Sequence, residues 1–195
     1  LGLNSNYSGS IKYDNFNIDS IPTREMAKIT TLITNDSYLV KGTVREHLSV
    51  RKNITEEEMY NALEKVNLRD FVEEHGGLDY ELAIGAANLS GGQKQRLLAA
   101  KAILKDSYLY ILDEAVSNID DYSKEIVLNA FDSIKEGKII IVISHDLETV
   151  TNADNIYVLK DKKIIEEGTH DELIVENSLY RKLFTDQQQL KSKFL

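Results

Sequence analysis

The sequence predicts an α/β protein built around a parallel sheet, and three observations support this. Continuous apolar runs at 108–112 and 139–143 each end in polar residues. A stretch with helical spacing joins these two runs, which is typical of parallel strands covered on both faces. The middle of the chain, about 46–105, carries helical patterns throughout. We therefore expect a helical part at 46–105 between strand-bearing flanks at 1–45 and 106–195.

The composition predicts one soluble globular domain of ordinary size. The 195 residues are 42% hydrophobic and 28% charged, and the net charge is −9. The negative charge argues against a nucleic-acid partner. No apolar run approaches the roughly 20 residues of a membrane-spanning helix, and no signal peptide is recognisable. The absence of cysteine excludes disulfide and thiol chemistry.

The first 34 residues predict a hairpin followed by a strand. Leu1 to Asn4 resemble the end of a helix, with Gly2 in the capping position. A Ser-Gly-Ser turn at 8–10 precedes apolar residues that alternate with polar ones from Ile11 to Ile18, a hairpin pattern. The β-branched segment 29–34 predicts a short strand.

Helix signals then follow one another to residue 75. Gly42-Thr43 is expected to open a helix that runs to Leu48. Thr55, with Glu58 three residues later, is a capping box for a helix to about Val66. The apolar stripe of that helix consists of Met59, Ala62, Leu63 and Val66. A short helix is expected around Phe71, before the irregular segment 76–88.

The second half predicts strands that alternate with helices. A long helix begins behind Ser90 and continues to Leu104, and a further helix covers about 122–134. Asp161-Lys162 lies between two short apolar pairs and predicts a hairpin turn. The tail predicts an amphipathic helix, whose apolar side carries Leu179, Tyr180, Leu183 and Phe184.

Polar residues that can bind a magnesium nucleotide follow both apolar runs. Asp113-Glu114 ends the first run and Ser144-His145 ends the second. Ligands of open α/β sheets bind beyond the carboxyl ends of the strands. One carboxylate can hold a hydrated Mg²⁺, the other can orient or deprotonate a water, and His145 can donate to a phosphate oxygen. The acidic pair alone is equally compatible with a simple strand end.

The segment Leu89-Ser90-Gly91-Gly92-Gln93 is a second candidate site. Ser90 can cap the helix that follows, and the two glycines allow a ligand to approach the backbone closely. The start of a helix favours phosphate because its N–H groups are free. The two glycines alone fit an ordinary loop before a capped helix better than a binding site.

Taken together, these segments resemble the ATPase domain of ABC transporters of the exporter type. Segment 89–96 resembles the signature motif, 108–114 the Walker B strand, 117–120 the D-loop and 143–145 the switch-histidine loop. Gly42-Thr43-Val44-Arg45-Glu46 and segment 165–173 resemble further segments of exporter-type domains. The resemblance covers essentially the whole chain, in the family's order.

The resemblance implies a P-loop NTPase-like (RecA-like) parallel-sheet lobe, 1–45 and 106–195, with the ABC helical subdomain at 46–105. It also implies a role for each matching residue. Asp113 would support Mg²⁺ through water, Glu114 would be the general base, and His145 would contact the γ-phosphate of ATP. The signature residues would bind the γ-phosphate of ATP held by an opposing domain, and Asp120 would link the two sites. The signature residues are Ser90, Gly91, Gly92 and Gln93.

The family's phosphate-binding P-loop is not found in these residues. The only Gly-Lys pair is Gly137-Lys138, which Ile139 follows. We therefore expect an N-terminally truncated domain that is a poor ATPase by itself. The absent strand is expected to lie beside the 108–112 run, so the chain is also expected to be less stable than a full domain or to self-associate.

Two smaller departures concern the metal and the coupling. Asn35 stands where the family has a glutamine that binds Mg²⁺, and its side chain is one methylene shorter. Segment 83–87 replaces an acidic stretch that meets the transmembrane coupling helices in exporters. Coupling is therefore expected to differ or to be weaker.

The leading hypothesis is an ATPase domain at the cytoplasmic face of a membrane, which couples ATP hydrolysis to substrate export. Its expected partners are a second ATPase domain, head to tail, and a transmembrane domain, with no nucleic acid. One alternative is the C-terminal half of a split ABC head in a DNA-repair or chromosome protein, which the exporter-like segments argue against. Another is a non-catalytic regulatory module, which the presence of Glu114 and His145 disfavours.

Overall fold

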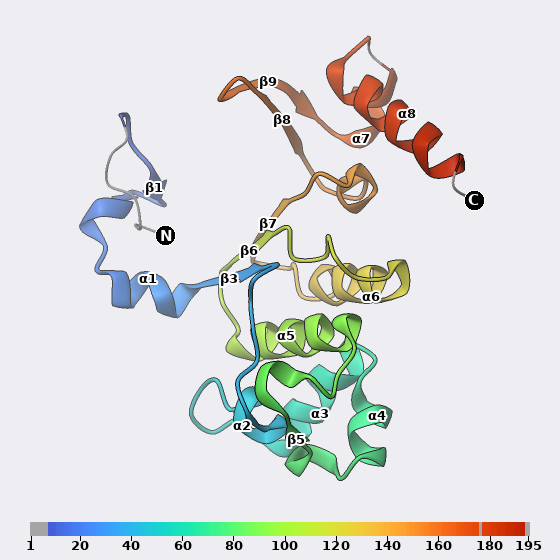
Figure 1. Ribbon diagram of the computed structural model, residues 1–195. Coiled ribbons are helices and arrows are strands. Elements are labelled where there is room, and N and C mark those ends of the chain that lie inside the picture. Colours follow the sequence, from blue (N-terminus) through green and yellow to red (C-terminus); the bar gives the residue numbers. More distant parts are fainter. Residues whose placement is uncertain (1–7, 176, 194–195) are drawn as a thin grey trace. The chain divides into compact units, whose positions relative to one another are not determined.

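The computed structural model describes residues 8–175 and 177–193, which belong to two compact units (Figure 1). The first unit ends at Ile143 and the second begins at Ser144. The expected helix end at Leu1–Asn4 lies outside the described residues. Within the described ranges, no helix combines the length and the apolar character that crossing a membrane requires.

The first unit begins with the predicted hairpin, in which β1 (Lys12–Tyr13) pairs antiparallel with β2 (Phe16–Asn17). A 3-10 turn, Ile18–Ser20, and helix α1 (Thr23–Ile29) lead to β3 (Thr30–Thr34). Helix α1 was not predicted. Its only buried residue is Met26, so it has no apolar stripe that a sequence pattern could reveal.

The sheet of the first unit has three parallel strands in the order β3-β6-β7 (Figure 1). The central strand β6 (Leu109–Asp113) is connected to β7 (Ile139–Ile143) through α6 (Asp121–Asp132). The expectation of another strand beside β6 is wrong for the described residues. The backbone groups of β6 already pair with β3 on one side and with β7 on the other.

One face of this sheet is covered, and the predicted cover on the second face is not found in the described residues. Tyr110 and Leu112 are buried on the side of α5 (Gly91–Lys105) and α6. On the opposite face, Leu32 is 40% exposed and Ile141 is 44% exposed. The alternation arises because successive strand residues point to opposite faces of the sheet.

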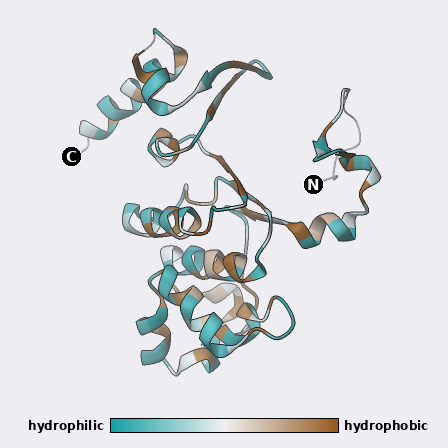
Figure 2. Ribbon diagram, turned by 180° about the vertical axis from the view of Figure 1, so that it is seen from behind, coloured by the Kyte–Doolittle hydropathy of each residue, from teal (hydrophilic) through white to brown (hydrophobic). Residues whose placement is uncertain are grey.

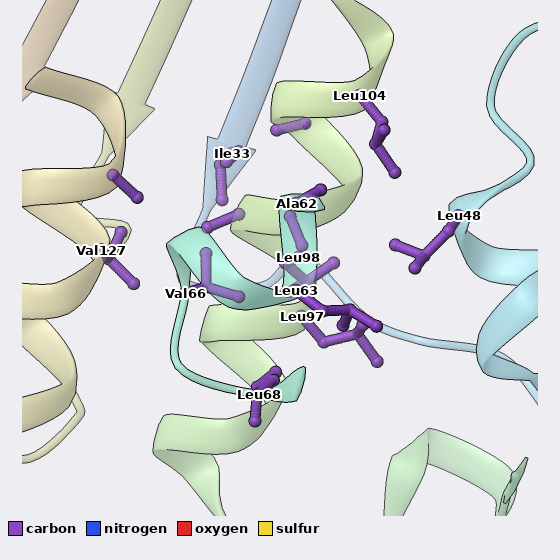
Figure 3. Close-up of a cluster of buried hydrophobic side chains, with 14 of the residues drawn as sticks. Ile33, Leu48, Ala62, Leu63, Val66, Leu68, Leu97, Leu98, Leu104 and Val127 are labelled. Carbon is purple, nitrogen blue, oxygen red and sulfur yellow. The ribbon is translucent and has the colours of Figure 1, made fainter. Parts of the chain in front are cut away.

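The helical region contains α2 (Val44–Leu48), α3 (Glu56–Lys65) and α4 (Arg69–Glu74) before α5. The predicted capping box of Thr55 and Glu58 is present, and the predicted apolar stripe of α3 is buried. Figure 3 shows Leu63 of α3 against Leu97 and Leu98 of α5, at the centre of the core. The limits of this region as a domain, 46 and 105, stay a prediction.

The segment between α4 and α5 is more regular than its sequence indicates. Two 3-10 turns, Gly77–Asp79 and Ile84–Ala86, flank β5 (Glu81–Leu82). This strand pairs antiparallel with β4 (Gly42–Thr43). The two-residue ribbon was not predicted because strands this short leave no periodic pattern.

The second unit consists of a 3-10 turn (Leu147–Val150), a hairpin and two helices. The hairpin joins β8 (Ile156–Lys160) to β9 (Lys163–Gly168), and Asp161 and Lys162 both have the positive φ that a tight hairpin turn requires. Helices α7 (His170–Val175) and α8 (Leu179–Ser192) follow and carry both hydrophilic and hydrophobic residues (Figure 2).

The predicted apolar side of α8 is only partly buried. Tyr180 is 1% exposed and joins the small core of the second unit. Leu179 and Phe184 are partly buried and pack against that core, whereas Leu183 is 44% exposed. The predicted helix is therefore present, and Leu183 on its apolar side stays largely exposed.

Candidate functional site

The carboxyl ends of the three parallel strands lie level with one another. Asp113, the last residue of β6, pairs with Thr34 of β3 and with Ile143 of β7. Asn35 follows β3 directly and is exposed, and Glu114 follows β6. The sheet therefore brings Asn35, Asp113 and Glu114 to one edge, where ligands of such sheets bind.

Glu114 begins a tight turn after the central strand. Its φ is +52°, an uncommon conformation for a residue other than glycine. Its N–H donates to the carbonyl of Ile143 over 2.9 Å, and its own carbonyl accepts from the Ser117 N–H at 3.2 Å and the Ser117 hydroxyl at 2.9 Å. Such backbone conformations persist where the surroundings fix them, often at functional sites. These bonds fix the backbone of Glu114, and with it the turn that follows Asp113 at the end of the strand.

The Ser90–Gln93 segment forms the start of α5 as a complete capping box. The Ser90 hydroxyl accepts from the Gln93 N–H at 3.1 Å, and the Gln93 side-chain oxygen accepts from the Ser90 N–H at 2.8 Å. As an acceptor in this bond, Ser90 keeps its own O–H for donation. Ser90 and Gly91 are exposed, so an anion can reach this helix start.

Gly92 is buried against the start of α6. A Cβ at this position would lie 2.2 Å from the Ser123 hydroxyl and 2.6 Å from a carboxylate oxygen of Asp120, so only glycine fits. Asp120 caps α6 by accepting from the Ser123 N–H at 2.8 Å, and this bond lowers the pKa of Asp120. Two predicted site residues that are distant in sequence, Gly92 and Asp120, are therefore neighbours.

Ser123 is a residue of this cluster that sequence reasoning missed. It is buried and contacts both the cap of α6 and the space beside Gly92. Its position three residues after Asp120 is the spacing of a helix cap, which is the one signal that could have found it.

His145 lies in the second unit, two residues after the end of β7 along the chain. It is exposed, and its loop leads into the 3-10 turn 147–150. The Ser144 hydroxyl accepts from the Asp146 N–H at 3.0 Å, which shapes the loop from its beginning. His145 is thereby presented by an ordered turn.

The residues at the sheet edge suit a hydrated magnesium ion. Within the described parts of the chain, no three His, Asp or Glu side chains converge to bind a metal by themselves. Mg²⁺ keeps several waters and commonly takes one or two carboxylates together with substrate phosphates. A single carboxylate such as Asp113 fits this mode, whereas a cation that needs an all-protein ligand cage would not fit.

Three exposed apolar side chains lie close to the β4–β5 ribbon along the chain. Gly42 pairs with Leu82, so Val40 and Ile84 lie two residues beyond the pairing at the same end. Val40 is 58% exposed, Ile84 is 81% exposed and nearby Tyr38 is 78% exposed. We call Tyr38, Val40 and Ile84 the ribbon patch. Exposed apolar patches often mark interaction sites.

Comparisons with known proteins agree on one family. A family model described as ABC transporter matches residues 1–117. An uncharacterized ABC transporter ATP-binding protein of Haemophilus influenzae is 43% identical over 192 residues, which cover 98% of this chain and 34% of that protein. The ATP-dependent lipid A-core flippase of Desulfotalea psychrophila is 36% identical over 181 residues, which cover 92% of this chain and 32% of the flippase.

A solved structure agrees with the fold. The structure of a bacterial Atm1-family ABC exporter with ATP bound matches with a TM-score of 0.85 and 25% identity. The match covers 93% of this chain and 32% of the exporter chain. The chain thus spans about a third of the length of these relatives.

Proposed function

We propose that this chain, which belongs to the ABC transporter family, contributes to an ATP-hydrolysing site. Hydrolysis at that site would drive export across a membrane. Asp113 would support a hydrated Mg²⁺, with Asn35 as a further oxygen ligand. Glu114 would act as the general base toward the attacking water. The single observation that carries this proposal is the paired carboxylate at the end of the central parallel strand, fixed by the turn at Glu114.

The helix starts would serve a nucleotide held by a second ATPase domain. Ser90 would donate its O–H to the γ-phosphate, and the start of α5 would add the backbone N–H groups of Gly91 and Gly92, since the Gln93 N–H is already bonded to the Ser90 hydroxyl. Asp120 lies beside Gly92 and would link the two sites of a head-to-tail pair. His145 would contact the γ-phosphate of the nucleotide bound on its own side.

The ribbon patch would receive a transmembrane partner at the cytoplasmic face of the membrane. It includes Ile84 of segment 83–87, for which the resemblance implies contact with coupling helices. Three large exposed apolar side chains suit the apolar face of a partner helix. Two relatives support this role by their names: the lipid A-core flippase and a multidrug resistance ABC transporter ATP-binding and permease protein of Lactococcus lactis, which is 33% identical over 183 residues.

The general-base role is tested by Glu114→Gln in the longest native polypeptide that carries this chain. We expect kcat for Mg-ATP hydrolysis to fall by roughly 10²- to 10⁴-fold, with little change in KM, because the amide cannot accept a proton. Glu125→Gln is the matched control, since Glu125 is exposed on α6. A Glu114→Gln protein that hydrolyses ATP at the normal rate would contradict the proposal.

The nucleotide affinity of the 195-residue chain itself is measured by calorimetric titration with Mg-ATP. We expect no measurable binding at micromolar concentrations, because no lysine-containing phosphate loop occurs in these residues. Clear micromolar binding would mean that another element cradles the phosphates, and the roles assigned above would then have to be revised.

A further inference from the structure

Helix α8 binds the His145 loop, which we define as residues 145–148, through one side-chain amide. The Gln187 Nε2 donates to the carbonyl of His145 over 2.9 Å. The Gln187 Oε1 accepts from the N–H of Leu147, also at 2.9 Å. A single side chain thus satisfies two backbone groups on either side of Asp146.

Two further residues on the same helix reinforce this attachment. Gln188 donates to a carboxylate oxygen of Glu148 over 2.6 Å. Lys191 contacts the other oxygen of Glu148 and also donates to Asp146 over 3.3 Å. The bond from Lys191, with that from Gln188, lowers the pKa of Glu148, so this carboxylate is ionised at neutral pH.

The opposite end of α8 is fixed to the hairpin of the second unit. The Glu166 carboxylate of β9 accepts from the N–H of Leu179 at 2.6 Å and from the N–H of Tyr180 at 2.9 Å. Tyr180 is buried, and its hydroxyl bonds with the His170 ring over 2.8 Å. The helix therefore has a fixed first turn and a polar second half that grips the loop.

We propose that Gln187 and Lys191 are positioning residues for His145. Through these residues, helix α8 would fix the loop in the conformation in which the His145 side chain can contact a nucleotide phosphate. The phosphate contact rests on the function proposed above, whereas the attachment of the loop to α8 does not.

The attachment is tested in the 195-residue chain without nucleotide, by comparing Gln187→Met with Gln189→Met. Methionine has a similar length and helix propensity but cannot replace the two amide hydrogen bonds. Gln189 is exposed on the same helix, which makes it a matched control. We expect the Leu147 amide to exchange roughly five- to thirtyfold faster in Gln187→Met alone. The ring signals of His145 should shift, while those of His47, buried in the first unit, stay unchanged.

The positioning role is tested by hydrolysis in the longest native polypeptide that carries the chain. Gln187→Met is expected to lower kcat roughly ten- to a hundredfold with KM unchanged, because the histidine is misplaced while nucleotide affinity is retained. Unchanged Leu147 exchange and unchanged His145 signals would overturn the attachment. Faster exchange with normal kcat, in an enzyme that depends on Glu114, would overturn the positioning role. If hydrolysis does not depend on Glu114, only the proposed function fails, and the exchange result still decides the attachment.

Discussion

The two units of this chain are stabilised by different kinds of contact. The first unit has a continuous apolar core that extends from the sheet through α5 to α3 (Figure 3). The buried core of the second unit consists of four described side chains, Ile156, Val158, Leu173 and Tyr180. Since apolar burial contributes about 25 cal/mol per Å², the first unit gains far more from packing than the second.

The second unit relies more heavily on carboxylates that accept backbone N–H groups. Glu166 holds the first turn of α8, and Glu172 accepts from the N–H of Thr169 at 2.8 Å at the start of α7. Such charge-assisted bonds are stronger than neutral ones but depend on protonation state and geometry. The comparison indicates that the first unit is sensitive to lost volume, whereas the second is sensitive to lost charge.

The largest effect is expected for Leu63→Ala in the core of the first unit. Leu63 is fully buried between α3 and α5, so truncation leaves a cavity in a packed interior. We expect a loss of about 2–5 kcal/mol in the free energy of unfolding of the first unit. Hydrogen exchange followed separately in each unit measures this, with the exposed Leu159 of the second unit truncated as a control. A loss below about 1 kcal/mol would break the comparison.

A smaller loss is expected for Gly92→Ala, where the core of the first unit meets the proposed site. The new Cβ would collide with Ser123 and Asp120, so α5 and α6 must move apart, at a cost of about 1–3 kcal/mol. The neighbouring Gly91→Ala is the matched control, because its Cβ would meet no atom within 4 Å. Thermal unfolding of both variants checks this, and equal midpoints would refute the close contact.

Local signals allowed much of this structure to be predicted from sequence. The capping boxes at Thr55 and Ser90 each involve only residues three positions apart in the sequence. The starts of α3 and α5 could therefore be predicted. The sheet order could not, since pairing of β6 with both β3 and β7 depends on long-range contacts. The same holds for the contact of Gly92 with Ser123 and for the reach of Gln187 to the His145 loop. The role of each site residue stays a prediction.

A still smaller loss in the free energy of unfolding is expected for Glu166→Ala in the second unit. The substitution removes the acceptor for two N–H groups in the first turn of α8, which we expect to cost about 1–2 kcal/mol. Glu167→Ala is the control, since exposed Glu167 accepts one bond, from Asn155. We expect its effect to stay within about 0.5 kcal/mol. If both variants lose the same stability, measured by exchange in the second unit, carboxylate capping does not hold that unit together.

The smallest change in the free energy of unfolding is expected from a change of pH, and the two units should respond in different pH ranges. Burial lowers the pKa of His47, which donates through Nε2 to the carbonyl of Val40 over 3.0 Å in the first unit. The unfolded state therefore takes up a proton first, and the first unit loses stability as pH falls below about 6.5, the ordinary value for histidine. The lowered pKa of Glu148 acts in a more acidic window in the second unit. Its contribution is present above about pH 4.5, the ordinary pKa of a glutamate, and is lost as pH falls through the lower folded-state pKa.

Replacing His47 by glutamine isolates the contribution of this histidine. Between pH 7.5 and 5.5, the variant's first unit should lose less stability than that of the wild-type chain, while the second unit should respond identically in both proteins. Hydrogen exchange in each unit, recorded with increasing denaturant at a series of pH values, gives the free energy of unfolding. Its slope against pH in the first unit is then compared between the variant and the wild-type chain. Because ∂ΔG/∂pH counts the protons that the unfolded state binds in excess, the difference between the slopes is the titration of His47 itself. Identical slopes in the first unit would show that this buried imidazole is protonated as readily in the folded state as in the unfolded state.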